Sequence, residues 1–290
     1  MTLLNNPICC HKLTGLTPKQ VCILSEKISQ LQIPWKFPAV GKTLLLLLWL
    51  RQYPVDAFTE WIFGISEGSF VKYRWQIVFQ LCCQYTDTFT FPQKEERQKY
   101  SVKFRNKTVV MVVDGTEQQC IAHVDRNISR TTRSGKKKLN TITKLAGINP
   151  RTGKLMYFVR SYRGAESDIT LCKLPQNIPC ELELDEAVLF DKGFVGIEET
   201  WHHCECIYPV KRRHGQEQVR FNHKQFNDEV KTYRIIVENY FAQLKKFKIL
   251  KFPFRCKGEI AEILAKHHQV WVVCAGIMDE FIHPNGFRVD

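Results

Sequence analysis

The stretch that decides the fold is residues 109–117, VVMVVDGTE. Five apolar residues in a row, four of them valine, predict a strand that is covered on both faces, as in the middle of an α/β sheet. Asp114 would then lie at the carboxyl end of that strand, where open α/β sheets usually bind their ligands. Because Asp-Gly is also a strong turn signal, a plain hairpin turn at Asp114 and Gly115 is the alternative.

The composition indicates a globular protein with an anionic partner. With 290 residues the chain has room for about two domains. Its 42 lysines and arginines exceed its 29 aspartates and glutamates, which gives a formal net charge of +13 at pH 7. This excess favours a polyanionic partner, with nucleic acid ahead of an anionic membrane.

No membrane span and no signal peptide are predicted. The most apolar run, residues 44–50, is far shorter than the ~20 residues that a spanning helix needs. The 12 cysteines include no C-x-x-C pair, which is typical of thiols in a reducing compartment rather than of a secreted protein. His202, His203, Cys204 and Cys206 form a dense group, but a structural zinc site is not favoured there because a second ligand pair at zinc-finger spacing is missing.

Residues 1–100 have the periodicity of a helical domain. After a helix that starts at Pro18, three more are predicted, at 43–52, 55–63 and 66–85. The short turn with Gly64 between the last two is typical of a helix-turn-helix, which would span about residues 43–85. Lys72 and Arg74, expected on the exposed face of the third helix, would then contact DNA. A plain helical bundle is the alternative.

Residues 101–290 have the texture of an α/β domain. Residues 87–105 are polar and are predicted to be a linker or a linking helix. Strands are predicted at 109–113, 120–124, 141–148, 154–162, 187–190 and 206–210. Helices are predicted at 168–174, 222–247 and 261–275.

Two further carboxylates share features with Asp114. Asp191 follows the apolar residues 187–190 and precedes Gly193, although Asp-x-Gly loops are also common turns. Glu238 falls at the edge of the apolar stripe of helix 222–247, where it could equally be a solvated i,i+4 partner of Arg234. Two carboxylates at strand ends and one on a helix suit hard cations such as Mg²⁺ or Mn²⁺. Two such ions about 3.5–4 Å apart can clamp an in-line phosphoryl displacement.

Five motifs occur in an order that resembles one known family. They are VVDGTE at 112–117, SGKKK at 134–138, GAESD at 164–168, FDKGF at 190–194 and RIIVENYFAQLKKF at 234–247. In this order they resemble the Harbinger-type transposases, the DDE superfamily endonucleases of the fourth transposase class. The resemblance covers nearly the whole chain from about residue 15, and residues 41–85 are similar to the helix-turn-helix that precedes the nuclease domain in some members.

The resemblance implies an RNase H-like nuclease domain over residues 101–290, preceded by the helical domain. It selects Asp114, Asp191 and Glu238 as the catalytic, metal-binding triad of a DNA endonuclease and strand transferase that uses two Mg²⁺ or Mn²⁺ ions. Asp168 matches a turn of the family and is interpreted as a structural helix start. Asp185 and Glu186 precede their strand and are poor candidates.

Partners and location follow from the same resemblance. We expect double-stranded DNA, as transposon ends and target, a homo-oligomer, and a separate Myb-like DNA-binding protein of the kind that family members often use. The protein would act in the nucleus of a eukaryote, or in the cytoplasm and nucleoid of a bacterium. A domesticated protein that keeps the fold for DNA binding or protein interaction without cutting is the alternative.

Several basic residues are candidate phosphate contacts. Those at the expected site are Lys136, Lys137, Lys138, Arg234 and Lys245. Residues 211–214, KRRH, are a candidate for DNA binding or nuclear import, with a solvated loop as the default interpretation.

Overall fold

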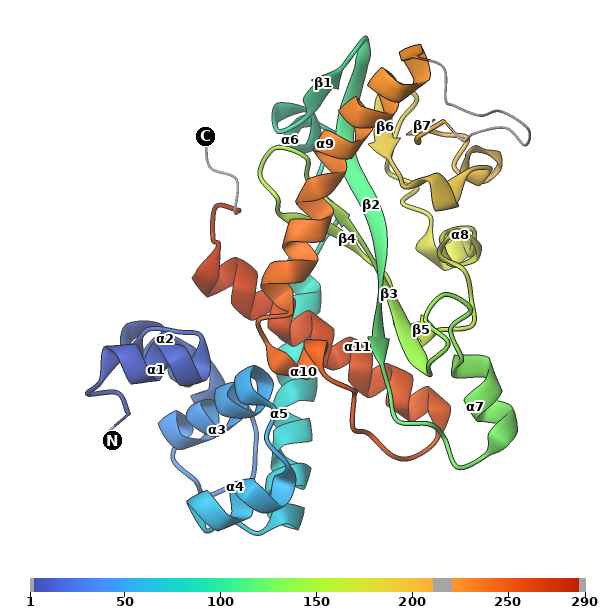
Figure 1. Ribbon diagram of the computed structural model, residues 1–290. Coiled ribbons are helices and arrows are strands. Elements are labelled where there is room, and N and C mark those ends of the chain that lie inside the picture. Colours follow the sequence, from blue (N-terminus) through green and yellow to red (C-terminus); the bar gives the residue numbers. More distant parts are fainter. Residues whose placement is uncertain (1–2, 211–220, 287–290) are drawn as a thin grey trace. The chain divides into compact units, whose positions relative to one another are not determined.

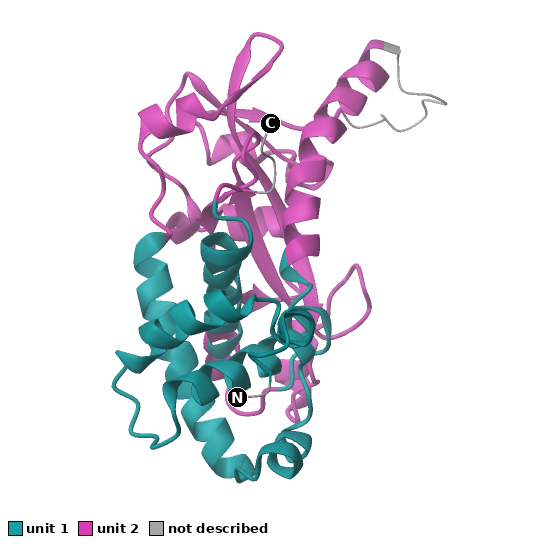
Figure 2. Ribbon diagram, turned by 90° about the vertical axis from the view of Figure 1, so that its left-hand side faces the viewer, with its two compact units in different colours: residues 1–88, 244–255, 266–284 teal, residues 89–243, 256–265, 285–290 magenta. Residues whose placement is uncertain are grey.

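The computed structural model describes residues 3–210 and 221–286, and it divides into two compact units. The helical unit comprises residues 1–88, 244–255 and 266–284. The sheet unit comprises residues 89–243, 256–265 and 285–290 (Figure 2). Among the described residues, no helix is long and apolar enough to cross a membrane. All 12 cysteines are free thiols.

The N-terminal part of the helical unit contains five helices. They are α1 (Pro7–Thr14), α2 (Pro18–Ser29), α3 (Ala39–Gln52), α4 (Asp56–Phe63) and α5 (Glu67–Thr88) (Figure 1). Thr17 and Gln20 form a capping box at the start of α2, in which each side chain accepts a hydrogen bond from the other residue's backbone N–H. The four predicted helices are confirmed, although α3 begins earlier than predicted, and α1 was not predicted.

α4 and α5 have the order and lengths of the predicted helix-turn-helix. Gly64 ends α4 in the left-handed conformation, with a φ of 63°, and its N–H donates to the Glu60 carbonyl at 2.9 Å. The Glu60 carboxylate accepts from the Glu67 N–H at 3.0 Å, which fixes the start of α5. A plain bundle would contain the same elements, so the helix-turn-helix stays a prediction.

The predicted exposure of Arg74 is wrong. Its side chain is buried, its guanidinium forms an ion pair with Asp56, and it lies 4.6 Å from the ring centroid of Trp49 and 5.0 Å from that of Phe70. The pattern along α5 could not show this, because Trp49 and Asp56 come from α3 and α4. Arg74 therefore does not lie on the exposed face where a DNA contact was expected, whereas Lys72 is exposed as predicted.

The helical unit also contains elements from near the C-terminus. They are α10 (Lys248–Lys251), residues 266–277 of α11 (Ile260–Ile277) and the π-helical turn η4 (Met278–Ile282). In η4, Glu280 accepts a hydrogen bond from the Tyr85 hydroxyl at 2.8 Å and lies 2.6 Å from the Lys27 ammonium. The sequence predicted a domain boundary near residue 100. The structure instead places residues 244–255 and 266–284 in the same unit as residues 1–88.

The sheet unit is built on one mixed sheet. Its strands are β1 (Val102–Phe104), β2 (Lys107–Gln119), β3 (Thr141–Ile148), β4 (Leu155–Phe158), β5 (Tyr162–Arg163), β6 (Glu186–Leu189) and β7 (Glu205–Ile207). The order is β4-β3-β2-β6-β7, with β1 paired to β2 and β5 to β3. β2, β6 and β7 run parallel, whereas β3 is antiparallel to β2 and to β4. This sheet confirms the predicted α/β class and is consistent with the RNase H-like fold.

β2 continues well beyond the predicted strand end. The residues from Asp114 to Gln119 stay in β2 and pair with β3, so Asp114 and Gly115 form no turn. Asp114 lies instead where the parallel pairing with β6 stops, two residues after the pair of Val112 and Leu189. The strand predicted at 120–124 does not form, because the long β2 already ends there.

Among the described residues, the sheet unit also contains the start of α11, at 260–265, together with four further helices and three short 3-10 turns. The helices are α6 (Lys94–Lys99), α7 (Arg126–Thr132), α8 (Asp168–Cys172) and most of α9 (Phe221–Leu244), and the turns are η1 (Pro175–Asn177), η2 (Lys192–Phe194) and η3 (Ile197–Glu199). The core combines strand residues such as Val113 and Leu145 with aromatic side chains such as Phe190 and Trp201, all fully buried.

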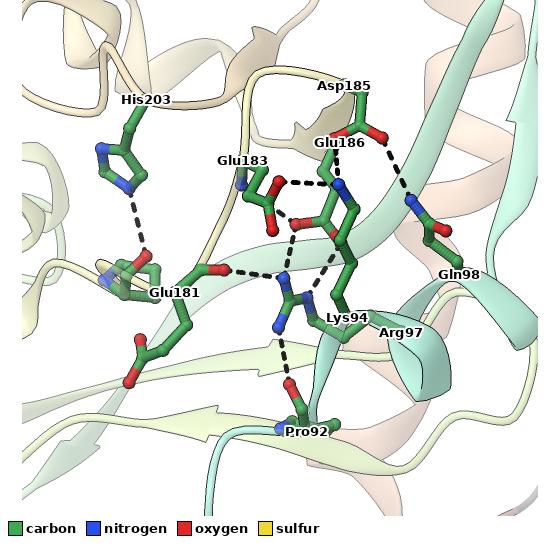
Figure 3. A network of polar contacts seen from close by, with 10 residues as sticks. Pro92, Lys94, Arg97, Gln98, Glu181, Glu183, Asp185, Glu186 and His203 are labelled. Carbon is green, nitrogen blue, oxygen red and sulfur yellow. Dashed lines mark hydrogen bonds and ion pairs between the residues drawn. The ribbon is translucent and has the colours of Figure 1, made fainter.

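A buried ion pair fixes α6 to the start of β6 (Figure 3). The Arg97 guanidinium donates to Glu186 at 2.9 and 2.6 Å, and to the carbonyls of Pro92 and Glu181 at 2.6 and 2.7 Å. The side chains of Arg97 and Glu186 are only 2% and 0% exposed. The prediction that Glu186 lies outside the site agrees with this structural role.

Candidate active site

Two aspartates lie at the same level of neighbouring parallel strands. Val112 in β2 pairs with Leu189 in β6, and Asp114 and Asp191 each follow that pair by two residues. Because residues two apart on a strand point to the same face, both carboxylates are directed to one side of the sheet. β6 ends at Leu189, and Asp191 lies two residues later, directly before η2.

The third carboxylate comes from α9. Of the predicted apolar stripe, Val230, Val237, Phe241 and Leu244 are buried, which confirms the orientation of this helix. Tyr233 is partly exposed and its hydroxyl donates to the Lys103 carbonyl at 3.2 Å. The side chain of Glu238, at the edge of the stripe, is 59% exposed.

Arg234 lies between all three carboxylates. Its Nη1 is 3.0 Å from Asp191 Oδ1, and its Nη2 is 3.6 Å from Asp114 Oδ2 and 3.7 Å from Glu238 Oε1. The guanidinium is 16% exposed, and its Nε is buried without a hydrogen-bond partner among the described residues. The structure thus brings the predicted triad together around one internal cation.

Burial perturbs the carboxyl group of Asp114. Loss of hydration raises the pKa of its carboxyl from 3.8 to about 6. The Gly115 N–H, which donates to Asp114 at 2.7 Å, and the charge of Arg234 oppose this rise, whereas the negative charges of Asp191 and Asp168 add to it. The carboxyl therefore holds a proton more readily than an exposed aspartate.

Asp168 is a fourth carboxylate at the site, which sequence reasoning missed. It begins α8 as predicted, after the N-cap Ser167, but its side chain packs against Gly115. A Cβ on Gly115 would lie only 2.6 Å from Asp168 Oδ1, so the glycine makes room for the carboxylate. The signal in the sequence was the presence of both motifs, GAESD and VVDGTE. It was not sufficient, because the contact between Asp168 and Gly115 joins segments that are far apart in the sequence.

The lysine loop, residues 134–138, lies beside these acids. Lys136 Nζ is 2.6 Å from Asp168 Oδ2, and Lys137 Nζ donates to the Glu117 carbonyl of β2 at 2.8 Å. The Ser134 hydroxyl accepts from the backbone N–H groups of Lys136 and Lys137, which shapes the loop. Lys138 is exposed and has a positive φ of 58°. The loop therefore presents cations next to the carboxylates.

The other predicted contacts belong to the helical unit or lie outside the described residues. Lys245 is half-buried, follows the last residue of α9 and belongs to the helical unit, as does Lys72. Residues 211–214 lie outside the described residues.

The histidines and cysteines at 202–206 make contacts of their own. His203 Nε2 lies 3.1 Å from the Pro179 carbonyl. A hydrogen bond with Cys206, together with burial, raises the pKa of the Cys204 thiol above its ordinary value.

Comparison with known proteins identifies the family. The model of the family described as DDE superfamily endonuclease matches residues 113–279, more than half of the 290 residues. This chain is a DDE superfamily endonuclease by descent. The match confirms the resemblance drawn from the five motifs, and it spans Asp114, Asp191, Arg234 and Glu238. Comparisons with curated proteins and with solved structures found no match.

DDE endonucleases generally use divalent metal ions, and the donor chemistry of this site fits them. Three carboxylates converge on one cationic group, so the place attracts positive charge. With the guanidinium between them, however, the residues that the structure describes contain no group of three or more acidic, histidine or cysteine side chains close enough to hold a metal ion. The Arg234 guanidinium lies among the carboxylate oxygens that a divalent ion would bind.

Proposed function

We propose that this DDE endonuclease cuts DNA and transfers the cut strand, as a transposase does, and that Asp114, Asp191 and Glu238 are its catalytic triad. The observation that carries the proposal is the convergence of these three side chains, from β2, the end of β6 and α9, on the Arg234 guanidinium. They are the same three acids that the family resemblance selects.

Each group has a role that follows from its place. Asp114 and Asp191 would hold divalent ions at the end of the β2–β6 pairing, and Glu238 would complete the ligand set. Two such ions, when bound, stabilise the attacking and leaving oxygens of a phosphodiester. Lys136, Lys137 and Lys138 would bind the DNA backbone and offset the repulsion between its phosphates and the acids.

The partners follow from the same function. Membership of the family implies a DNA substrate. We propose double-stranded transposon ends and target DNA, a homo-oligomer that brings two ends together, and a Myb-like protein as a helper. In a eukaryote the protein would act in the nucleus.

The test is cleavage of supercoiled plasmid in Mg²⁺ or Mn²⁺ by the wild type, by Asp191→Asn and by Asp185→Asn. Asp185 is a matched control, because it is an exposed aspartate just before β6 that pairs with Lys94 at 3.0 Å. We expect cation-dependent nicking by the wild type and by Asp185→Asn, and none by Asp191→Asn.

Two outcomes would contradict the proposal. Equal nicking by all three proteins would mean that Asp191 is not catalytic. DNA binding without nicking by any of them would favour the domesticated, non-cutting protein.

A further inference from the structure

The three carboxylates bind the Arg234 guanidinium weakly. Only the contact with Asp191, at 3.0 Å, is within hydrogen-bond distance; those with Asp114 and Glu238 are 3.6 and 3.7 Å. Arginines frequently bind carboxylates as a two-pronged fork, and this one does not. Its Nε is buried without a hydrogen-bond partner among the described residues, so at least one donor of the guanidinium is unsatisfied.

The guanidinium and a divalent ion cannot share this place. Oxygen ligands bind hard divalent ions at about 2.0–2.6 Å. An ion at that distance from Asp114 and Asp191 would lie within a few ångströms of the present guanidinium, where the repulsion between the two cations greatly exceeds thermal energy. One cation must leave when the other binds.

We propose that Arg234 is an internal counter-ion: it neutralises the three carboxylates in the metal-free protein and leaves them for a DNA phosphate when a divalent ion binds. The inference rests on the proposed function, which supplies both the ion and the phosphate. Its consequence is competition, because the ion must displace the arginine. A bound DNA phosphate would accept the released guanidinium, so DNA and metal would strengthen each other's binding.

The carboxylates themselves do not depend on Arg234 for their positions. Asp114 lies within the continuous pairing of β2 with β3, and Asp191 lies two residues after the last pair of β6 with β2. α9, which carries Glu238, is anchored by the buried Val230 and Val237. Removing the guanidinium should therefore leave the acids in place and make the site more negative.

The experiment measures the dissociation constant of Mn²⁺ without DNA, by electron paramagnetic resonance of the free ion. The variants are Arg234→Gln, Asp191→Asn and, as a matched control, Lys231→Gln, which removes the same charge from an exposed position of α9. Circular dichroism checks that each variant is folded. We expect Arg234→Gln to bind Mn²⁺ about tenfold more tightly than the wild type or better. The dissociation constant of Lys231→Gln should stay within about twofold of the wild-type value because solvent screens the charge of Lys231. Asp191→Asn should no longer bind Mn²⁺ tightly.

The outcomes separate the inference from the proposed function. If Asp191→Asn loses Mn²⁺ while Arg234→Gln binds it no better than the wild type, the counter-ion role is wrong and the metal site stands. If Asp191→Asn binds Mn²⁺ as the wild type does, the proposed metal site is wrong, and the inference fails with it.

A measurement on the wild type guards against a variant that fails to fold. The Arg234 Nε–H signal in ¹⁵N–¹H spectra, assigned by its loss in Arg234→Lys, should shift on addition of Mg²⁺ and exchange faster with water. A signal unchanged at saturating Mg²⁺ would show that the guanidinium stays among the carboxylates and would overturn the proposal.

Discussion

At the scale of single residues, the site is a balance between burial and charge. Asp114 pairs with β3 just beyond the end of the β2–β6 pairing, and there loss of hydration outweighs the favourable Gly115 N–H and Arg234. Asp191 and Glu238 are more exposed, with side chains 32% and 59% accessible. Of the three carboxylates around Arg234, Asp114 is therefore the least exposed, at 18%.

The burial of Asp114 predicts that Asp114→Asn is more stable than the wild type, by an amount that depends on pH. Because the pKa of Asp114 is raised from 3.8 to about 6, folding favours its protonated form, and the stability contributed by this group is present below about pH 4 and lost as the pH rises through 6. Asparagine resembles the protonated form. In chelator, the free energy of unfolding of the variant should exceed that of the wild type at pH 7, by at most roughly 3 kcal/mol, and approach it near pH 4.

Urea unfolding from pH 4 to 8 measures the difference. Asp185→Asn is the control, since a hydrogen bond from Lys94 lowers the pKa of that carboxyl and no such gain is expected. A difference between Asp114→Asn and the wild type that stays constant with pH would contradict the burial argument.

At the scale of elements, the buried ion pair of Arg97 and Glu186 fixes the start of β6. Asp191 lies two residues after the end of the same strand. Arg97→Met leaves the Glu186 carboxylate buried without its partner and should lower the free energy of unfolding by about 3–5 kcal/mol. The double variant Arg97→Met/Glu186→Leu removes both charges and should recover much of that loss. Lys94→Met, which breaks the exposed pair with Glu183, should have a much smaller effect.

Denaturant unfolding of the three variants and the wild type tests this. A double variant no more stable than Arg97→Met would mean that the loss comes from packing or from the Arg97 contacts with backbone carbonyls rather than from the stranded carboxylate.

Local patterns were enough to predict most elements, and the family resemblance selected the three carboxylates that lie around Arg234. The apolar run before Asp191 and the stripe around Glu238 are visible along the chain, and both side chains reach the site. The continuation of β2 past Asp114 could not be predicted, because it depends on pairing with β3 and on Asp168 packing against Gly115. The burial of Arg74 likewise depends on partners in other helices.

At the scale of the whole molecule, the net charge of +13 should make DNA binding strongly dependent on salt. If Lys136, Lys137 and Lys138 each neutralise a phosphate, changing all three to glutamine should reduce the slope of log K against log salt concentration by about 2–3. A control triple at Lys94, Lys107 and Lys173 removes equal charge from lysines that are already paired with glutamates.

Titrations of a duplex at several salt concentrations give both slopes. Equal reductions in the two triples would show that only net charge matters and that the lysine loop has no special place in binding.

Crystals of the protein grown with Mn²⁺ would locate the cation site itself. We predict an anomalous peak within about 2.0–2.6 Å of carboxylate oxygens of Asp114 and Asp191, with the Arg234 guanidinium no longer 3.0 Å from Asp191. A peak at Asp114 and Asp191 beside an unmoved Arg234 would contradict only the counter-ion role of the arginine, whereas a strongest peak elsewhere on the protein would contradict a metal-dependent active site at this position.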